Sequence, residues 1–208
     1  MKVDRGCVAA GLEQLCAREL RSLLPGVAIS TIEPGRLRFC YGGSPSRTLL
    51  LRTVDDVFAH IADLDGLSGR EADLALIEAA ASRADLEPAL ALREALGTIP
   101  KAPSFRVTGR RAGEQDYNSQ QAAGFAGGGI VAQRGWRVDL TGHDLEIGLH
   151  IEGEHALIGL RLSDDAMAAR SRVVHGVASL HPPIAHALCL LSAPEVGETF
   201  LDPMCGAG

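Results

Sequence analysis

Apolar and polar positions follow either a two-residue or a helical period along most of the chain, and these periods predict its secondary structure. In the N-terminal part the expected elements are a strand 3–9, a helix 12–24, strands 27–32 and 37–41, a helix 46–51 and a strand 54–61. Pro25-Gly26 ends the first helix, and Pro34-Gly35 marks the turn between the next two strands. The succession strand, helix, strand, strand, helix, strand is that of a ferredoxin-like fold.

A second α/β module follows a helix-rich segment. Ala, Leu, Glu and Arg dominate residues 69–96, which Glu87-Pro88 divides into two helices and which Gly97 caps. Beyond them the expected elements are a strand 104–109, a helix 119–134, a strand 136–140 and a hairpin with arms 145–151 and 156–162. The last part of the chain predicts a helix 182–192, a loop 194–198 and an apolar strand 199–201. Together the elements predict an α+β fold with more than one domain.

Composition narrows the class of protein. The 208 residues are 46% hydrophobic and 22% charged, as in ordinary globular proteins, which excludes a disordered or collagen-like chain. The net charge is −6, whereas a domain dedicated to nucleic acid usually carries a basic excess. Composition alone therefore argues weakly against RNA, because only the field at the binding face has to be positive.

Cysteine spacing and the longest apolar run bear on metal sites and on location. The cysteines form no Cys-x-x-Cys pair, so we expect reduced thiols and neither a zinc site nor a disulfide framework. The longest apolar run, near residues 184–191, is too short to span a membrane. Asp4 and Arg5 interrupt what would have to be a signal peptide. We therefore expect a cytoplasmic protein.

The sharpest chemical signal is the heptapeptide Asp-Pro-Met-Cys-Gly-Ala-Gly at 202–208. An apolar strand followed by an acidic residue and a Gly-x-Gly turn lets the backbone approach a bound nucleoside, although an ordinary strand-to-helix turn can have the same pattern. Together with Ser-Leu-His-Pro-Pro-Ile-Ala at 179–185, the heptapeptide resembles the opening of the class I S-adenosyl-L-methionine-dependent RNA methyltransferases that modify guanine. The resemblance implies a cofactor site that includes Ser179, His181, Pro182, Asp202, Pro203, Cys205, Gly206 and Gly208.

A second set of motifs lies between residues 105 and 162. Phe-Arg-Val at 105–107, Arg110-Arg111, Asn-Ser-Gln-Gln at 118–121, Trp-Arg-Val-Asp-Leu at 136–140 and Asp-Leu-Glu-Ile at 144–147 occur in the order found in the THUMP domain, which this region resembles. In that family the domain binds the acceptor end of tRNA. The predicted RNA-binding residues are Arg106, Arg110, Arg111, Asn118, Ser119 and Gln120.

The same residues allow a physical interpretation. Arginines placed beside the N-terminus of a helix attract phosphate, because the helix dipole and the free N–H groups favour an anion there. The alternative is an ordinary solvated charged face, and Glu114 and Asp116 dilute the positive charge.

Glycines at 124 and 127–129 depart from a regular helix, since each interior glycine costs about 1 kcal/mol relative to alanine. An irregular helix, a phosphate-binding loop and close packing against a neighbouring backbone are the alternatives. No Gly-Lys-Ser or Gly-Lys-Thr follows, so packing is favoured over a phosphate loop. His143, His150 and His155 lie around the hairpin without acidic or thiol partners at ligand spacing, and we expect no metal there.

These observations predict a ferredoxin-like domain at 1–66, a THUMP domain at 67–164 that includes helices 69–97, and a linker with the first strand of a truncated Rossmann-like methyltransferase domain at 165–208. The implied function is methyl transfer from S-adenosyl-L-methionine to the exocyclic N2 of a guanine in tRNA.

The alternatives are an equivalent enzyme for ribosomal RNA, a non-enzymatic THUMP-type adaptor and a protein-interaction module. A tRNA thiolation enzyme is disfavoured, because its Ser-Gly-Gly-x-Asp-Ser loop is missing. The Asn/Asp-Pro-Pro-Tyr loop that the family uses for catalysis does not occur either, so we expect residues 1–208 to bind RNA and to be inactive alone. The target nucleotide and the oligomeric state stay open.

Overall fold

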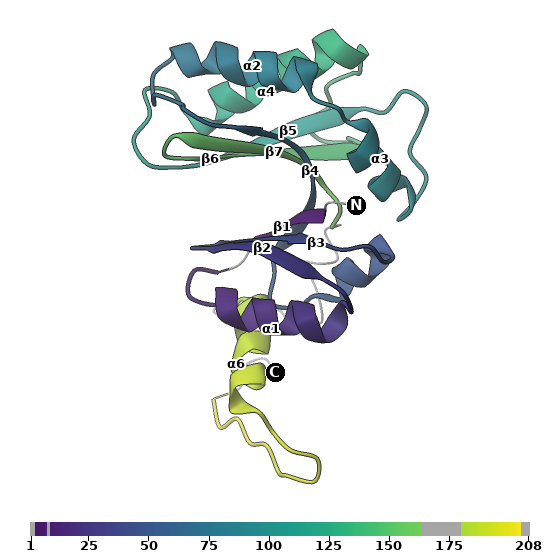
Figure 1. Ribbon diagram of the computed structural model, residues 1–208, viewed down its shortest axis with the longest axis vertical. Coiled ribbons are helices and arrows are strands. Elements are labelled where there is room, and N and C mark those ends of the chain that lie inside the picture. Colours follow the sequence, from purple (N-terminus) through teal and green to yellow (C-terminus); the bar gives the residue numbers. More distant parts are fainter. Residues whose placement is uncertain (1–2, 8, 164–179, 205–208) are drawn as a thin grey trace. The chain divides into compact units, whose positions relative to one another are not determined.

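The computed structural model describes residues 3–7, 9–163 and 180–204 (Figure 1). The chain divides into two compact units, one made of residues 1–57 and 163–208 and the other of residues 58–162. None of the helices in these described segments is long and apolar enough to cross a membrane.

The first unit begins with a strand, a helix and a β-hairpin. Its elements are β1 (Val3–Cys7), α1 (Glu13–Leu23), β2 (Ala28–Glu33), β3 (Arg36–Cys40), the 3-10 helix η1 (Pro45–Leu50) and the start of β4 (Asp56–Leu64). β3 pairs antiparallel with both β1 and β2. α1 buries Leu15 and Leu20. The elements follow the predicted succession, except that the second helix is a 3-10 helix.

Two carboxylates of α1 fix the turns of this unit. Glu13 accepts hydrogen bonds from the backbone N–H groups of Gly11 and Gly35, at 3.0 and 2.7 Å. Burial would raise the pKa of Glu13, but the hydrogen bond from Gly35, which is the largest influence, lowers it overall. Glu19 is buried and accepts from the backbone N–H of Arg52 at 2.9 Å. The helix and the turn after η1 are therefore joined by side-chain to backbone bonds.

In the second unit, two long helices lie on one face of a β-sheet (Figure 1). The unit contains the rest of β4, α2 (Ala72–Arg83), α3 (Glu87–Glu94), β5 (Phe105–Ala112), α4 (Ser119–Arg134), β6 (Leu145–Glu152) and β7 (His155–Arg161). The strand order is β4-β7-β6-β5, with β5 and β6 parallel and the other pairs antiparallel. The fully buried side chains Phe105, Ile147 and Ile158 form part of its core.

α4 is continuous through its glycines, and its ends lie where the sequence predicts them. Asn118 and Gln121 form a reciprocal capping box at its start, and Gly135 ends it in the left-handed conformation at φ +65°. A Cβ at Gly129 would collide with the backbone oxygen of Glu78 on α2. Close packing against a neighbouring backbone, the favoured explanation of the glycines, is confirmed, and the helix is not irregular.

Two predicted strands are wrong. Residues 136–140 make only a single bridge, between Val138 and Phe105. The Asp139 carboxylate accepts from the backbone N–H groups of Thr141 and Gly142, which turns the chain away from β5. Residues 199–201 form no strand in the described structure, and Phe200 and Leu201 are exposed. A strand needs a paired neighbour, and alternating or apolar sequence alone does not supply one.

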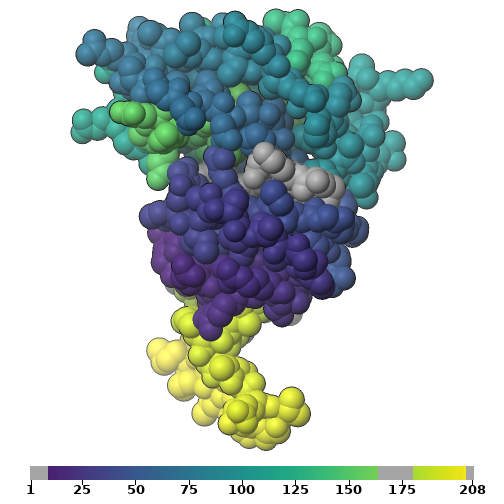
Figure 2. Space-filling model, in the orientation of Figure 1, coloured from purple at the N-terminus to yellow at the C-terminus, as the bar shows by residue number. Residues whose placement is uncertain are grey.

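α6 (Pro182–Ser192) begins at the predicted proline and lies in the first unit. Its side chains Pro183 and Ala187 are buried, whereas its C-terminal half is exposed. Residues 193–204 continue it without regular secondary structure and are drawn in yellow in Figure 2.

Candidate nucleic-acid interface

A polar hollow of about 590 Å³ lies in the second unit, where β5 ends and where both α2 and α4 begin. Its lining comes from the loop before α2 and from the loop between β5 and α4. The lining residues are Ser68, Gly69, Arg70, Arg111, Gly113, Glu114, Gln115 and Asp116. The positive ends of two helix dipoles therefore lie beside this hollow, which we call the groove.

Asp73, in the first turn of α2, accepts hydrogen bonds from both loops beside the groove. Its carboxylate accepts from the backbone N–H and the hydroxyl of Ser68 at 3.0 and 2.9 Å, from the N–H of Gly69 at 2.8 Å and from the Tyr117 hydroxyl at 3.3 Å. Burial alone would raise the pKa of Asp73, but the hydrogen bonds from Ser68, Gly69 and Tyr117 outweigh it and lower the pKa. Burial and the neighbouring Asp73 charge raise the pKa of Tyr117 to about 12, so the phenol stays protonated and donates. The two groove loops are thus tied to one buried anion.

A backbone bond joins the same two loops at the groove floor. The N–H of Asp116 donates to the carbonyl oxygen of Gly69 at 2.7 Å. Gly69 has φ +78°, and a Cβ on it would lie 3.1 Å from the backbone oxygen of Glu114. Only glycine fits this conformation without strain.

Two arginines give the groove its positive charge. Arg111, at the end of β5, donates to Gln115 Oε1 at 2.9 Å and to the carbonyl of Gly113 at 3.3 Å, which folds its guanidinium over the loop. Arg70 lies two residues before Ala72, the first residue of α2, and is exposed. Glu114 and Asp116 are exposed in the same lining, so the groove combines cationic donors with carboxylate acceptors.

The predicted residues Asn118, Ser119 and Gln120 lie at the N-terminus of α4. Asn118 Oδ1 accepts from the N–H of Gln121 at 2.8 Å, so this side chain is committed to the cap. Within the described segments, the backbone N–H groups of Ser119 and Gln120 have no acceptor, as expected at a helix start. Gly109 lets the start of α4 approach β5 closely, because a Cβ there would collide with the carbonyl of Ser119.

The strand pleat separates the predicted arginine cluster. Side chains alternate along β5, so Arg111 shares with Gly109 the face over which α4 begins, whereas Arg106 and Arg110 point to the opposite face. The proposed positive cluster of all three arginines beside Ser119 is therefore wrong in its geometry. Arg111 alone accompanies the helix N-terminus.

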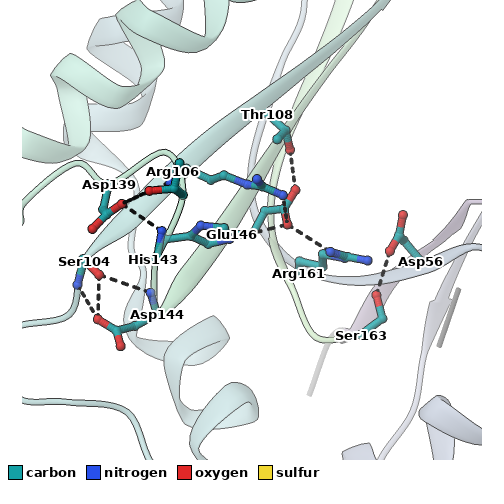
Figure 3. Close-up of polar contacts among 12 residues, drawn as sticks. Asp56, Ser104, Arg106, Thr108, Asp139, His143, Asp144, Glu146, Arg161 and Ser163 are labelled. Carbon is teal, nitrogen blue, oxygen red and sulfur yellow. Dashed lines mark hydrogen bonds and ion pairs between the residues drawn. The ribbon is translucent and has the colours of Figure 1, made fainter. Parts of the chain in front are cut away.

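Arg106 is engaged by Glu146 on the adjacent strand (Figure 3). Glu146 accepts from Arg106 at 2.9 Å, from Arg161 at 3.0 Å and from the Thr108 hydroxyl at 3.0 Å. Burial would raise the pKa of Glu146, but these donors lower it overall. Three neighbouring strands thus contribute one residue each to a structural ion network on this face, namely Arg106, Glu146 and Arg161.

The described residues of the predicted cofactor site have local partners within the first unit. His181 Nε2 lies 3.2 Å from Asp55 Oδ1, Pro182 is the first residue of α6, and Asp202 Oδ1 accepts from the N–H of Met204 at 2.8 Å. Pro203 follows in the same turn. Ser179, Cys205, Gly206 and Gly208 lie outside the described residues.

The hairpin histidines have separate partners. His155 Nδ1 lies 2.6 Å from Asp65 Oδ1, the ring of His150 packs edge-on against Phe58 at 5.1 Å, and His143 Nε2 is 3.8 Å from Glu146. Residues 3–7, 9–163 and 180–204 contain no group of three or more side chains arranged to hold a metal.

Most of the second unit matches a known domain family. Residues 77–161 match the family model of the THUMP domain. Residues 77–161 are a THUMP domain. Residues 169–208 match the RMKL-like methyltransferase domain family.

Relatives of this chain are tRNA guanine-N2 methyltransferases. The chain is 31% identical over 199 residues to the tRNA (guanine(6)-N2)-methyltransferase of Thermus thermophilus, covering 95% of this chain and 56% of that protein. It is 33% identical over 110 residues to the bovine tRNA (guanine(6)-N(2))-methyltransferase THUMP3, covering 52% of this chain and 22% of the relative. The crystal structure of TrmN from Thermus thermophilus is similar, with a TM-score of 0.70 and 29% identity over 93% of this chain and 55% of that one. The chain thus spans about half, or less, of the length of these relatives.

Sequence reasoning missed Arg70, Asp73 and Tyr117 of the second unit. Asp73 and Tyr117 are 44 positions apart, and their contact depends on how α2 and α4 pack. The only local signal is Ser68-Gly69 ahead of a helix with an acidic first turn, a pattern that many helix starts share.

Proposed function

We propose that this chain is the RNA-binding part, with the opening of the catalytic domain, of an S-adenosyl-L-methionine-dependent methyltransferase that modifies guanine N2 in tRNA. The single observation that carries the proposal is the 31% identity to the Thermus thermophilus tRNA enzyme across 95% of the chain. The groove of the THUMP domain supports the RNA-binding part independently, through its arginines and helix N-termini.

The groove suits a phosphodiester better than an uncharged partner. Arg111 and Arg70 present guanidinium donors to the groove, and α4 begins three residues after Asp116, the last residue of the lining. Glu114 and Asp116 can accept from ribose hydroxyls or base amines, which gives the groove acceptors that a plain anion site lacks. RNA offers both kinds of partner.

The methyl-transfer site is proposed to lie beyond the described residues. S-adenosyl-L-methionine would supply an electrophilic methyl group on its sulfonium. The described candidates do not fit a cofactor pocket by themselves, because His181 faces Asp55 and Asp202 caps its own turn. Residues 1–208 should therefore bind tRNA without methylating it, and we further infer that the first unit is ferredoxin-like, from its element order.

The function is tested by extending the chain through a complete methyltransferase domain and supplying labelled S-adenosyl-L-methionine with tRNA. Label should appear at a guanine N2 of tRNA, and ribosomal RNA should accept much less. If the extended chain binds tRNA but transfers no methyl group, the alternative of a non-enzymatic RNA-binding adaptor is favoured. Tight tRNA binding that does not change with salt would contradict binding through phosphate contacts, since such contacts weaken steeply as salt rises.

Replacing either groove arginine by glutamine is expected to weaken tRNA binding about ten-fold and to reduce the salt dependence by about one phosphate contact. Arg83, exposed at the other end of α2, is the matched control for Arg70. Arg83→Gln should leave the affinity within about two-fold. Filter binding at several salt concentrations measures both quantities, and equal losses for Arg70→Gln and Arg83→Gln would rule out the groove.

Arg106→Gln is expected to act on stability more than on RNA. It removes one of the donors of the largely buried Glu146 carboxylate, which should cost about 1–2 kcal/mol. Urea unfolding and tRNA titration of the same variant separate the two effects. Weak tRNA binding with unchanged stability would instead restore Arg106 to the RNA-binding set.

A further inference from the structure

The guanidinium group of Arg111 is held by a single nitrogen. Its Nη1 atom donates to Gln115 Oε1 at 2.9 Å and to the carbonyl oxygen of Gly113 at 3.3 Å. Within residues 3–7, 9–163 and 180–204, the Nε and Nη2 atoms of Arg111 have no hydrogen-bond partner. One edge of the guanidinium group is therefore bound by the loop, and the edge formed by Nε and Nη2 is left for a ligand.

The unused edge has the geometry that a phosphate needs. Nε and Nη2 are two parallel donors, and such a pair matches two oxygens of a phosphodiester. A lysine in the same place would offer a point charge without this paired geometry.

Gln115 can hold Arg111 in only one way. Its Nε2 donates to the carbonyl oxygen of Ala112 at 3.1 Å while its Oε1 accepts from Arg111. A reversed amide would place an NH₂ group against the guanidinium and an oxygen against the carbonyl, so the two contacts fix the amide orientation. Gly113, at φ +100°, makes room for this side chain, because a Cβ there would lie 3.2 Å from Gln115 Nε2.

Arg70, the other groove arginine, is not held in this way. Its backbone N–H donates to Ser68 Oγ at 3.3 Å, and its side chain has no hydrogen-bond partner in the part of the chain that the structure describes. Arg111 also acts on Tyr117, whose pKa burial and Asp73 raise to about 12, because the positive charge of Arg111 opposes that rise. The groove thus contains one cation of fixed orientation and one that no bond orients.

We propose that Gln115 is a positioning residue, which holds Nη1 of Arg111 so that the edge formed by Nε and Nη2 binds one phosphodiester in the groove. The inference rests on the proposed function, because RNA is the source of the phosphate. A side chain that is ordered before binding loses less entropy when the contact forms. Arg111 therefore supplies a directed contact, whereas Arg70 supplies mainly charge.

Gln115→Met tests the positioning role. Methionine has a similar length but forms neither of the two hydrogen bonds, so tRNA binding should weaken about three- to five-fold. The salt dependence should stay the same, because the charge of Arg111 is kept. Gln133→Met is the matched control, since Gln133 Nε2 also donates to a backbone carbonyl, that of Ala84 at 2.7 Å, and no described side chain donates to its oxygen. Filter binding should show no change in tRNA affinity for this control.

Arg111→Lys separates the direction of the contact from its charge. Affinity should fall about five-fold with the salt dependence unchanged, in contrast to Arg111→Gln, which also lowers the salt dependence. In the Arg111→Lys background, Gln115→Met should cause no further loss, because no guanidinium edge is left to orient. An equal loss in both backgrounds would overturn the proposal, since Gln115 would then support the loop or contact RNA itself. Tighter binding by Gln115→Met would overturn it too, by making Gln115 a lock that withholds Arg111 from RNA.

NMR of residues 1–208 without RNA tests the held side chain apart from the proposed function. Rotation about the Nε–Cζ bond of Arg111 should be about ten-fold faster in Gln115→Met than in the unsubstituted chain, because the hydrogen bond that resists it is gone. Equal rates in these two proteins would overturn the proposal.

The binding data separate the two possible failures. A loss of tRNA affinity on Arg111→Gln but none on Gln115→Met would refute the positioning role and leave the proposed function intact. If neither Arg111→Gln nor Arg70→Gln weakened tRNA binding, RNA binding by the groove would be refuted, and with it the phosphodiester as the ligand of Arg111.

Discussion

Gly129→Ala is expected to lower the free energy of unfolding of the THUMP domain by about 2–3 kcal/mol, a large effect for one methyl group. The new Cβ would collide with the carbonyl oxygen of Glu78 and lie 2.9 Å from both Ala81 Cβ and Ser82 N on α2. Two of these three atoms belong to the helix backbone, which cannot move aside as the end of a side chain can. α2 and α4 would have to separate, and urea unfolding followed by circular dichroism measures the cost.

Gly124→Ala is the control on the same helix. Nothing lies within 4 Å of a Cβ at this exposed position, so alanine should only restore helix propensity and raise the free energy of unfolding by about 0.5–1 kcal/mol. The two substitutions thus have opposite signs for the same chemical change. A stabilising Gly129→Ala would show that α2 and α4 are not in close contact at this point.

Elements with strong local signals are the ones that the sequence predicts correctly. Both ends of α4 follow from residues next to them, an asparagine cap and a terminal glycine, and the start of α6 follows from its prolines. The capping chemistry lies within a few residues of each end, so no knowledge of the tertiary fold is needed.

The rest of the site depends on pairing that is distant in sequence. Gly109 marks the end of the predicted strand at 104–109, yet β5 continues to Ala112, because the glycine makes room for the start of α4. The longer strand places Arg110 and Arg111 on opposite faces, which separates the predicted cluster. Residues 199–201 have the composition of a strand, but no described strand pairs with them.

Asp73→Asn is expected to destabilise the second unit by about 2–4 kcal/mol, because the buried carboxylate accepts four hydrogen bonds and an amide offers one acceptor oxygen. An amide NH₂ group in place of Oδ2 would face both the N–H of Gly69 and the hydroxyl of Tyr117, and in place of Oδ1 it would face both donors of Ser68, so at least one backbone N–H would lose its acceptor. The groove loops would loosen together, so tRNA binding should weaken as well. Asp116→Asn removes the same charge from the same groove, but its bond to Gly69 uses the backbone, so its stability should change little.

The pH dependence of the free energy of unfolding tests the role of the Asp73 carboxylate independently. The pKa of Asp73 is lower in the folded chain than its ordinary value of 3.8, so its contribution is complete above that value and is lost as the pH falls through the lower, folded pKa. Unfolding measured between pH 2 and pH 7 should therefore show a shallower acid limb for Asp73→Asn than for the unsubstituted chain. Asp116→Asn should keep the steep limb. An identical acid limb in all three proteins would mean that Asp73 is not the anion that ties the two groove loops together, and the groove would then need another explanation for its shape.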